Sequence, residues 1–207
     1  FQRWDNSFDR QPLLKYHATL GIETVNNDND NAALFAQFGY HVRGSATRFR
    51  SFLGIGNPVV FKEEFLFRNL ALVLGAKQKF QLGPNSRYFY FAGVRGEYTM
   101  STNLEDLTRD RDQFFRILYP FDGAVNHWMV GASAGGGIEL PFSELVGGQL
   151  TLSVNPDFLL QYNQPAIGNV IDPFNPGQSI NIPERRIRNV TLELTLALRL
   201  IRKVVYE

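Results

Sequence analysis

Three histidines are the side chains best suited to acid–base chemistry near neutral pH, because the imidazole ring titrates in that range. They are His17, His41 and His127. A hydrolase site would also require a nucleophile within hydrogen-bond reach of one of them. Ser51 and Ser133 are candidates, but no spacing in the sequence links either serine to a histidine. We therefore expect no catalytic residue and assign the histidines to hydrogen bonding, with a lipid or peptide hydrolase as the alternative.

Metal, cofactor and nucleic-acid sites have little support in the sequence. The absence of cysteine excludes disulfides and thiolate metal ligands. The run Asn26–Asn31 could hold a calcium ion weakly, but a solvated turn is the better interpretation. With 21 basic and 20 acidic residues the formal net charge is +1, which gives no electrostatic footprint for nucleic acid. We expect no cofactor, no metal ion and no nucleic-acid partner.

The segment His127–Pro141 shows the sequence pattern of the elements that must position the histidines and the other polar side chains. From Trp128 to Leu140, every second residue is apolar or glycine, and the residues between them are small or polar and end in Glu139. A period of two predicts a β-strand. An apolar face opposite a face on which half of the residues are glycine suits lipid on one side and a crowded interior on the other, as in a membrane β-barrel. Gly131, Gly135 and Gly137 should make room for neighbouring interior side chains.

Seven further segments alternate in the same way, so the sequence predicts an all-β, up-and-down antiparallel transmembrane β-barrel of eight strands in a single domain, residues 1–207. We expect an irregular lead-in over residues 1–12, a break at Gly44–Thr47, a loop at Asn57–Glu64 and a bulge or bend at Pro156. No stretch approaches 18 uninterrupted apolar residues, which excludes a transmembrane helix. The further predicted strands are Leu14–Val25, Ala33–Arg43, Arg48–Gly56, Phe65–Phe80, Arg87–Thr99, Gln149–Tyr162 and Arg188–Arg202.

The lengths of the connections predict which rim of the barrel faces the periplasm and which faces the exterior. The two longest connections, 100–126 and 163–187, fall on one rim when the predicted strands are counted in order. Short connections near Gly44, Gln81 and Phe142 fall on the other, and by the same count the connection at Asn26–Asn31 joins the long-loop rim. Short periplasmic turns and long extracellular loops are typical of outer-membrane barrels. A hairpin hidden in 100–126 would raise the strand count to ten.

Charged residues on the predicted inner face indicate a neutralising network. A barrel of about eight strands is filled by side chains, and buried charges need partners. The predicted polar network comprises Glu23, Lys77, Arg95, Glu97, Glu139, Asp157, Glu193 and Arg199.

The first long loop contains an unusually apolar run for an exposed segment. Such a run either packs over the barrel mouth or marks a contact surface for a partner protein. The charged residues Arg109–Asp112 and Glu184–Arg186 could contact lipopolysaccharide phosphates or a partner, and ordinary solvated charge explains them equally well. The apolar residues are Phe114, Phe115, Ile117, Leu118, Tyr119 and Phe121.

Four segments carry a resemblance to a known family: Arg68–Phe80, Tyr88–Tyr98, Val130–Pro141 and Arg188–Leu200. With these strands the chain resembles the small outer-membrane β-barrel proteins of Bacteroidota, the family that includes PorT-like proteins. The resemblance implies an outer-membrane location and, for some members, an accessory role in secretion or gliding machinery. The opening residues FQRWDNSFDR lack the features of a signal peptide, so for a protein exported as the resemblance implies, we expect that the signal has already been removed.

We therefore expect a structural or accessory subunit of an envelope complex. Its partners would be outer-membrane lipid, lipopolysaccharide and other envelope proteins, contacted through the external loops or the barrel wall. A small pore, an outer-membrane enzyme and a soluble ligand-binding barrel are the alternatives.

Overall fold

The computed structural model of the chain describes residues 2–4, 10–24, 31–51, 59–83, 86–109, 119–143, 145–172, 175 and 177–200. Within these ranges, side chains are described except at 2–4, 10–12, 47–51, 59–62 and 108. Strands dominate the described residues, and the predicted all-β antiparallel class is confirmed. In this part of the chain, no helix is both long enough and apolar enough to cross a membrane.

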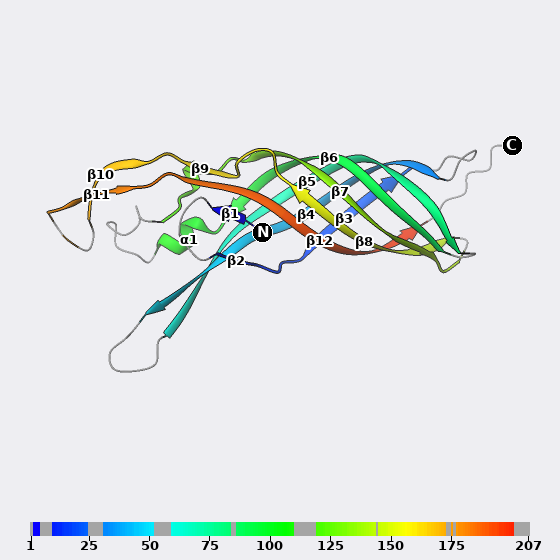
Figure 1. Cartoon of the computed structure of the whole chain (residues 1–207), viewed down its shortest axis with the longest axis horizontal. Helices are drawn as coiled ribbons and strands as arrows, with labels where there is room; N and C mark the ends of the chain where they lie inside the picture. The colour runs from blue at the N-terminus through cyan, green and yellow to red at the C-terminus, as the bar shows by residue number, and fades with distance from the viewer. Residues whose placement is uncertain are drawn as a thin grey trace.

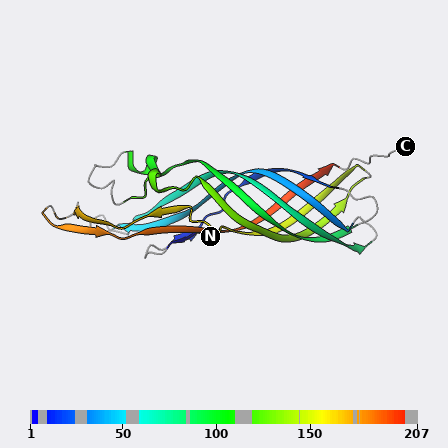
Figure 2. The ribbon, with the colours of Figure 1, turned by 90° about the horizontal axis from the view of Figure 1, so that it is seen from above.

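Among the described residues, ten strands form one antiparallel sheet that coils about a long axis (Figures 1 and 2). They are β1 (Gln2–Trp4), β2 (Arg10–Pro12), β3 (His17–Glu23), β4 (Ala32–Ser51), β5 (Val59–Gly83), β6 (Ser86–Thr102), β7 (Trp128–Pro141), β8 (Val146–Pro156), β9 (Tyr162–Gln164) and β12 (Arg185–Leu200). Their order is β1-β12-β8-β7-β6-β5-β4-β2; β3 pairs with β4 beyond β2, and β9 pairs with β12 beyond β8. These described strands therefore occupy eight positions across the sheet.

The remaining described elements lie between the long strands. A short helix, α1 (Leu104–Arg109), and a 3₁₀ turn, η1 (Asp122–Ala124), follow β6. A separate hairpin, β10 (Ile167–Ile171) with β11 (Ser179–Ile182), precedes β12. Residues 100–126 and 163–187 were expected to be irregular, and the structure instead places these elements and β9 within them. The expected irregular lead-in likewise contains β1 and β2.

The predicted strand Ala33–Arg43 and residues 48–51 of the predicted strand Arg48–Gly56 belong to a single strand, β4. The predicted break at Gly44–Thr47 is wrong, because β4 pairs with β5 without interruption from Ala32 to Ser51. Gly44 is part of the ladder: a Cβ there would lie 2.3 Å from the carbonyl oxygen of Phe65, so the backbones approach too closely for a side chain. The predicted loop at Asn57–Glu64 is strand from Val59 onward, and residues 52–58 lie outside the described part.

Merging these strands changes which connections share an end. The connections β3–β4, β5–β6 and β7–β8 lie at one end of the sheet, hereafter the turn end. The backbone N–H of Lys79 donates to the carbonyl of Asn31 at 2.7 Å, which puts the β3–β4 connection beside the β5–β6 turn. The assignment of that connection to the long-loop rim was therefore wrong. The connections that carry α1 and the β10–β11 hairpin lie at the opposite end, hereafter the loop end (Figure 1).

Alternation along the strands separates two faces of opposite character. On β12, five leucines from Leu192 to Leu200 are between 66% and 85% exposed. On the opposite face the charged side chains of Arg95 and Glu97 are 1% and 2% exposed. The coiled sheet thus buries charge on its inner face and exposes large apolar side chains on its outer face, the reverse of a water-soluble core.

The loop end contains an apolar core of its own. Tyr162, whose place in the alternation of the predicted strand Gln149–Tyr162 predicts an outward side chain, is fully buried in it, because the β12 ladder shifts after Pro156. Pro156 pairs with Val190 and Tyr162 pairs with Ile187. Tyr162 is six positions after Pro156, whereas Ile187 is only three positions before Val190, so three extra residues lie on the side of Pro156 and Tyr162. The irregularity expected at Pro156 thus falls directly after it. The core comprises Phe65, Phe67, Leu104, Val125, Tyr162 and Ile187.

Close backbone contact at Gly137 leads to a stability prediction. A Cβ at Gly137 would lie 2.0 Å from the carbonyl oxygen of Leu150, whereas one at Gly96 would have nothing within 4 Å. We expect Gly137→Ala to lower the free energy of unfolding by about 1–3 kcal/mol. Gly96→Ala, the matched control, should change it by less than about 0.5 kcal/mol. Urea unfolding of both variants in detergent measures the difference, and equal effects would contradict the close contact.

Candidate functional site

All eight charged residues predicted for the interior lie on the inner face, where the described side chains gather in two clusters. The turn-end cluster comprises Glu23, Lys77, Lys79, Glu139 and Arg199. The central cluster comprises His41, Arg43, Arg95, Glu97, Asp157 and Glu193. Lys79, Arg43 and His41 were absent from the predicted network, although the same alternation that selected their neighbours Lys77 and Arg95 places them on this face.

The turn-end cluster is organised around Lys77 and Arg199. The ammonium of Lys77 donates to Glu23 Oε2 at 2.7 Å and to Glu139 Oε1 at 3.3 Å, and lies 4.4 Å from the ring centroid of Phe89. Arg199 bonds the same two carboxylates, through Nη1 to Glu139 Oε2 at 2.6 Å and through Nη2 to Glu23 Oε1 at 3.5 Å. Side chains from β3, β5, β7 and β12 are thereby joined across the interior.

The central cluster is the more deeply buried of the two. Arg95 Nε lies 2.9 Å from Glu97 Oε1, and its Nη2 donates to Asp157 Oδ1. Arg43 reaches the same carboxylates, at 2.6 Å from Glu97 Oε1 and 3.4 Å from Asp157 Oδ1. The amide of Asn189 adds a hydrogen bond to Asp157 Oδ2 at 3.0 Å. Each buried carboxylate thus has cationic or amide partners, which desolvated charges require.

The glycines of β7 provide the space for these groups, as predicted. A Cβ at Gly131 would lie 3.2 Å from Arg95 Nη2, and one at Gly137 would lie 2.8 Å from the ring of Phe89. Larger residues there would displace the arginine or the aromatic ring from the interior.

Two of the histidines stack against each other on the inner face. The rings of His17 and His41 are 5.2 Å apart and within 7° of parallel. His17 Nε2 lies 2.9 Å from Thr195 Oγ1, and His41 Nδ1 lies 3.1 Å from Glu193 Oε1. The hydroxyl and the carboxylate therefore contact different rings, so the four groups do not form the linear relay of a nucleophilic site. Sequence reasoning missed Thr195 because it lies 178 positions from His17.

The other predicted catalytic candidates lie elsewhere. Ser133 donates to Asn155 Oδ1 at 2.6 Å, and the side chain of Ser51 lies outside the described part. His127 is exposed, with its Nδ1 2.8 Å from the carbonyl of Thr99. Within the described residues, no group of three or more His, Cys, Asp or Glu could hold a metal ion. Most of Asn26–Asn31, the weak calcium candidate, lies outside them.

A cavity of about 160 Å³ opens beside the stacked histidines. Its lining comes from residues 13–17, from 41–44 on β4, and from Asn189 and 191–194 on β12. Apolar residues such as Leu14 and Leu194 lie on its outer side, and His17, Arg43 and Glu193 lie on its inner side. It is thus a gap in the wall of the coiled sheet.

The predicted contact loop is described only in part. Phe114, Phe115, Ile117 and Leu118 lie outside the described residues, as do Asp110, Arg111 and Asp112. Tyr119 is half-buried, whereas Phe121 is 44% exposed and its backbone N–H donates to the hydroxyl of Tyr162 at 3.2 Å. Burial raises the pKa of that hydroxyl above its ordinary value.

The predicted external charges differ in exposure. Arg109 and Arg186 pair with Asp106 and Glu184 on the surface. Arg185, expected to be an external contact, is instead buried, and its Nη1 lies 3.5 Å from Gln164 Oε1.

Removing the central guanidinium should be costly. Arg95→Ala leaves Glu97 and Asp157 with fewer cationic partners in a buried site, and we expect a loss of about 3–5 kcal/mol in the free energy of unfolding. Arg188→Ala, at an exposed position on β12, serves as the control and should cost less than about 0.5 kcal/mol. Denaturant titration of the two variants provides the comparison. A small loss for Arg95→Ala would mean that the network does not hold the strands together.

No protein-family model, no curated protein and no solved structure matches this chain in the comparisons made.

Proposed function

We propose that the protein is an integral outer-membrane β-barrel protein that acts as a structural or accessory subunit of a larger envelope complex. The observation that carries this proposal is the inverted distribution of side chains. The five exposed leucines of β12 would each gain roughly 1.5–3 kcal/mol on leaving water. Similar side chains on the other strands continue this apolar belt, including Leu72, Val94 and Leu152. A bilayer provides that environment for a whole sheet face at once.

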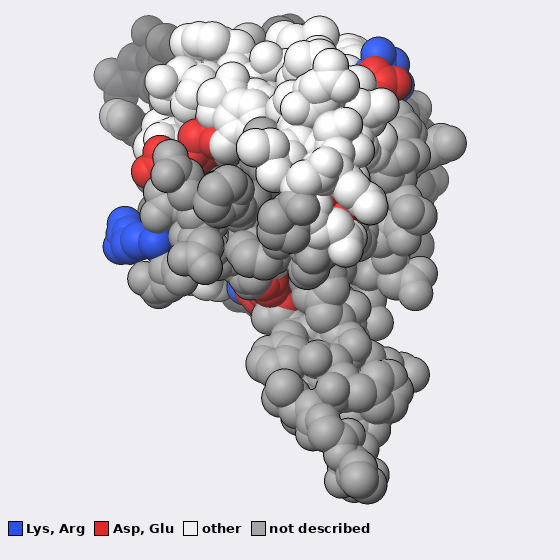
Figure 3. Space-filling model, turned by 90° about the vertical axis from the view of Figure 1, so that its left-hand side faces the viewer, with Lys and Arg blue, Asp and Glu red and all other residues white. Residues whose placement is uncertain are grey.

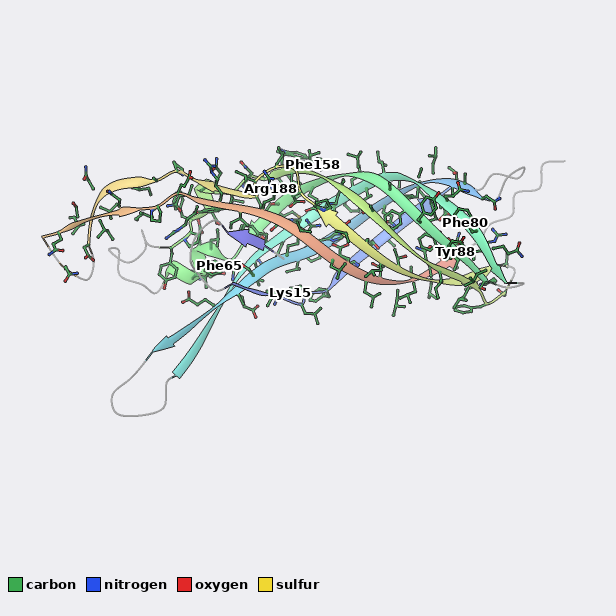
Figure 4. All side chains as sticks on the ribbon, in the orientation of Figure 1. Lys15, Phe65, Phe80, Tyr88, Phe158 and Arg188 are labelled. Atoms are coloured by element: carbon green, nitrogen blue, oxygen red, sulfur yellow. The ribbon has the colours of Figure 1, made fainter. Side chains whose placement is uncertain are left out.

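Aromatic pairs mark the two borders of this belt. Tyr98 packs against Trp128 at 4.8 Å at the loop-end side of the β6–β7 ladder. Phe80 stacks on Tyr88 at 4.9 Å near the turn end (Figure 4). Ten residue steps separate Tyr88 from Tyr98 on β6. At roughly 3.3 Å per step and a tilt of roughly 40°, they span about 25 Å, the height of the apolar band in outer-membrane barrels.

The arrangement of the edges supports closure into a barrel of eight strands. The sheet has eight strand positions, seven from β3 to β12 and an eighth that β1 occupies beside β12, and side chains of β3 and β12 meet across that eighth position. His17 reaches Thr195 at 2.9 Å, and Glu23 reaches Arg199 at 3.5 Å. The turn end would then face the periplasm and the loop end the exterior.

The filled interior favours a structural role over a small pore. Both charge clusters cross the inner face and bond side chains from several strands, so a water path would require breaking them. The loop end favours interaction with a partner: Figure 1 shows β4 and β5 projecting as a hairpin beyond the sheet, and Figure 3 shows a largely uncharged surface over the described residues of this end. The resemblance to Bacteroidota outer-membrane proteins points to the same class of function.

A lysine on the outer face tests the membrane location. Val94 lies midway along β6 and is 63% exposed, so Val94→Lys should be neutral in water but cost roughly 2–4 kcal/mol at a bilayer midplane. Leu145→Lys, equally exposed in the turn after β7, is the control at the rim. We expect lower insertion into lipid vesicles for Val94→Lys only, measured by heat-modifiable migration and protease protection. A protein that stays soluble and monomeric in buffer, with both variants neutral, would refute the proposal.

Trimming the projecting hairpin tests the accessory role. Replacing residues 49–61 with a short Gly-Ser turn removes the projection and leaves the belt and both charge clusters unchanged. We expect the barrel to insert normally but to lose its larger complex on blue-native electrophoresis of envelope extracts. The same trimming of the β10–β11 hairpin provides a comparison at the same end. A wild-type protein that migrates only as a free monomer would count against a subunit role.

A further inference from the structure

Arg188 on β12 faces three residues of the neighbouring segment instead of one. Backbone hydrogen bonds close the ladder on both sides of this place, at 3.0 Å from Asp157 N–H to the Asn189 carbonyl and at 2.9 Å from Gln161 N–H to the Ile187 carbonyl. Between these two bonds lie Arg188 on one side and residues 158–160 on the other. We call residues 158–160 the bulge. Figure 4 shows Phe158 and Arg188 in the same region of the sheet.

The bulge lies at the loop-end border of the apolar belt. The N–H of Phe158 donates to the carbonyl of Val130 at 2.8 Å, two residues from Trp128 in β7. Trp128 belongs to the aromatic pair that marks this border. Phe158, Leu159 and Val190 are all exposed, so the apolar surface continues from the bulge onto β12. In the proposed membrane barrel, this is where hydrocarbon gives way to lipid head groups.

Several hydrogen-bond donors at this place have no acceptor in the described part of the chain. They are the backbone N–H groups of Leu159 and Leu160 and the exposed guanidinium of Arg188. A donor without an acceptor is strongly disfavoured beside hydrocarbon, where water cannot replace the missing partner. The border of the belt is therefore a place where a ligand that brings acceptor oxygens would be bound.

The charge of this place is positive. Arg186 is exposed on the same face of β12, two positions from Arg188, and its Nη2 lies 2.9 Å from Glu184 Oε2. A third arginine, Arg3, is paired with Arg188 across the β1–β12 ladder. Of the acids in the adjoining described segments, Asp157 is buried on the inner face and Glu184 is engaged by Arg186. An anion would therefore meet cations here without a competing carboxylate at Arg188.

We propose that Arg188, Arg186 and the bulge bind the phosphate of a membrane lipid, whose acyl chains lie along Phe158 and Val190. This inference rests on the proposed membrane location, because it places the site at the level of the head groups. The guanidinium of Arg188 supplies two parallel N–H donors to a phosphate, and the N–H groups of the bulge supply further donors. A lipid fits better than a free anion, because its hydrocarbon also covers the exposed apolar side chains.

Lipid titration of the full-length protein in uncharged detergent tests the site. The probes are phosphatidic acid and the diacylglycerol with the same acyl chains, and native mass spectrometry measures the bound fraction. We expect phosphatidic acid to bind at least tenfold more tightly, and Arg188→Gln to remove most of that preference. Arg109→Gln, at an exposed arginine that pairs with Asp106 on α1, is the matched control and should keep the preference within twofold. Equal binding of the two lipids by the wild type would overturn the proposal.

Soluble competitors distinguish a lipid from other sources of the same charge. Inorganic phosphate and glycerol phosphate should bind at least tenfold more weakly than phosphatidic acid, because they leave the apolar surface of the bulge uncovered. Equal binding would identify a site for a soluble phosphate and overturn the lipid assignment. Displacement of phosphatidic acid by hexaglutamate at equal concentration would overturn it in favour of an acidic polypeptide.

A proline variant isolates the backbone donors of the bulge. Leu159→Pro removes one N–H that has no acceptor in the described structure, and it should weaken binding of phosphatidic acid at least fivefold. Leu159→Ala keeps that N–H and should change binding less than twofold, so equal losses would overturn the role of the backbone. Heat-modifiable migration first shows that each variant inserts into vesicles. Loss of lipid preference in a wild-type protein that inserts would overturn this inference alone, whereas failure of insertion would overturn the proposed function.

Discussion

The buried contacts of Arg95 with Glu97 and Asp157 are the interaction on which the other parts of the structure depend. The guanidinium of Arg95 on β6 reaches across β7 to a carboxylate just after β8 and holds these neighbouring strands at a fixed separation. Because charge occupies the inside, the leucines have to lie outside, and because the arginine is large, the facing strand has to carry glycine. Burial of these charges costs free energy that their pairing offsets, which explains why Arg43 and Asn189 also contact these carboxylates.

Alternation in the sequence was sufficient to assign faces, because a two-residue period places each side chain on one side or the other without knowledge of partners. It placed Glu23, Lys77 and Arg199 on one face, and the structure joins them. It fails where glycine has two possible roles: the sequence predicts a break at Gly44, whereas this glycine permits a close backbone approach within a continuous strand. That single error split β4 in two and shifted the expected position of the first connection.

Contacts between distant segments could not be predicted from the sequence. The bond between His17 and Thr195 depends on how the ends of the sheet come together, which no local pattern encodes. The burial of Tyr162 depends on a three-residue shift after Pro156, and the proline signalled a disruption but not its size. Lys79 and Arg43 could have been found, because they continue the alternation of residues already selected.

The apolar core at the loop end has a consequence for the order of assembly. It joins Phe65 on β5 to Ile187 at the start of β12, so it draws on early and late parts of the chain together. Its members belong to the end that would have to cross the bilayer, and they can cluster only after the last strand has arrived. In the proposed membrane barrel, the loop end would therefore acquire its shape as the final event of insertion, and a chain stalled before β12 would display the loops without their native surface.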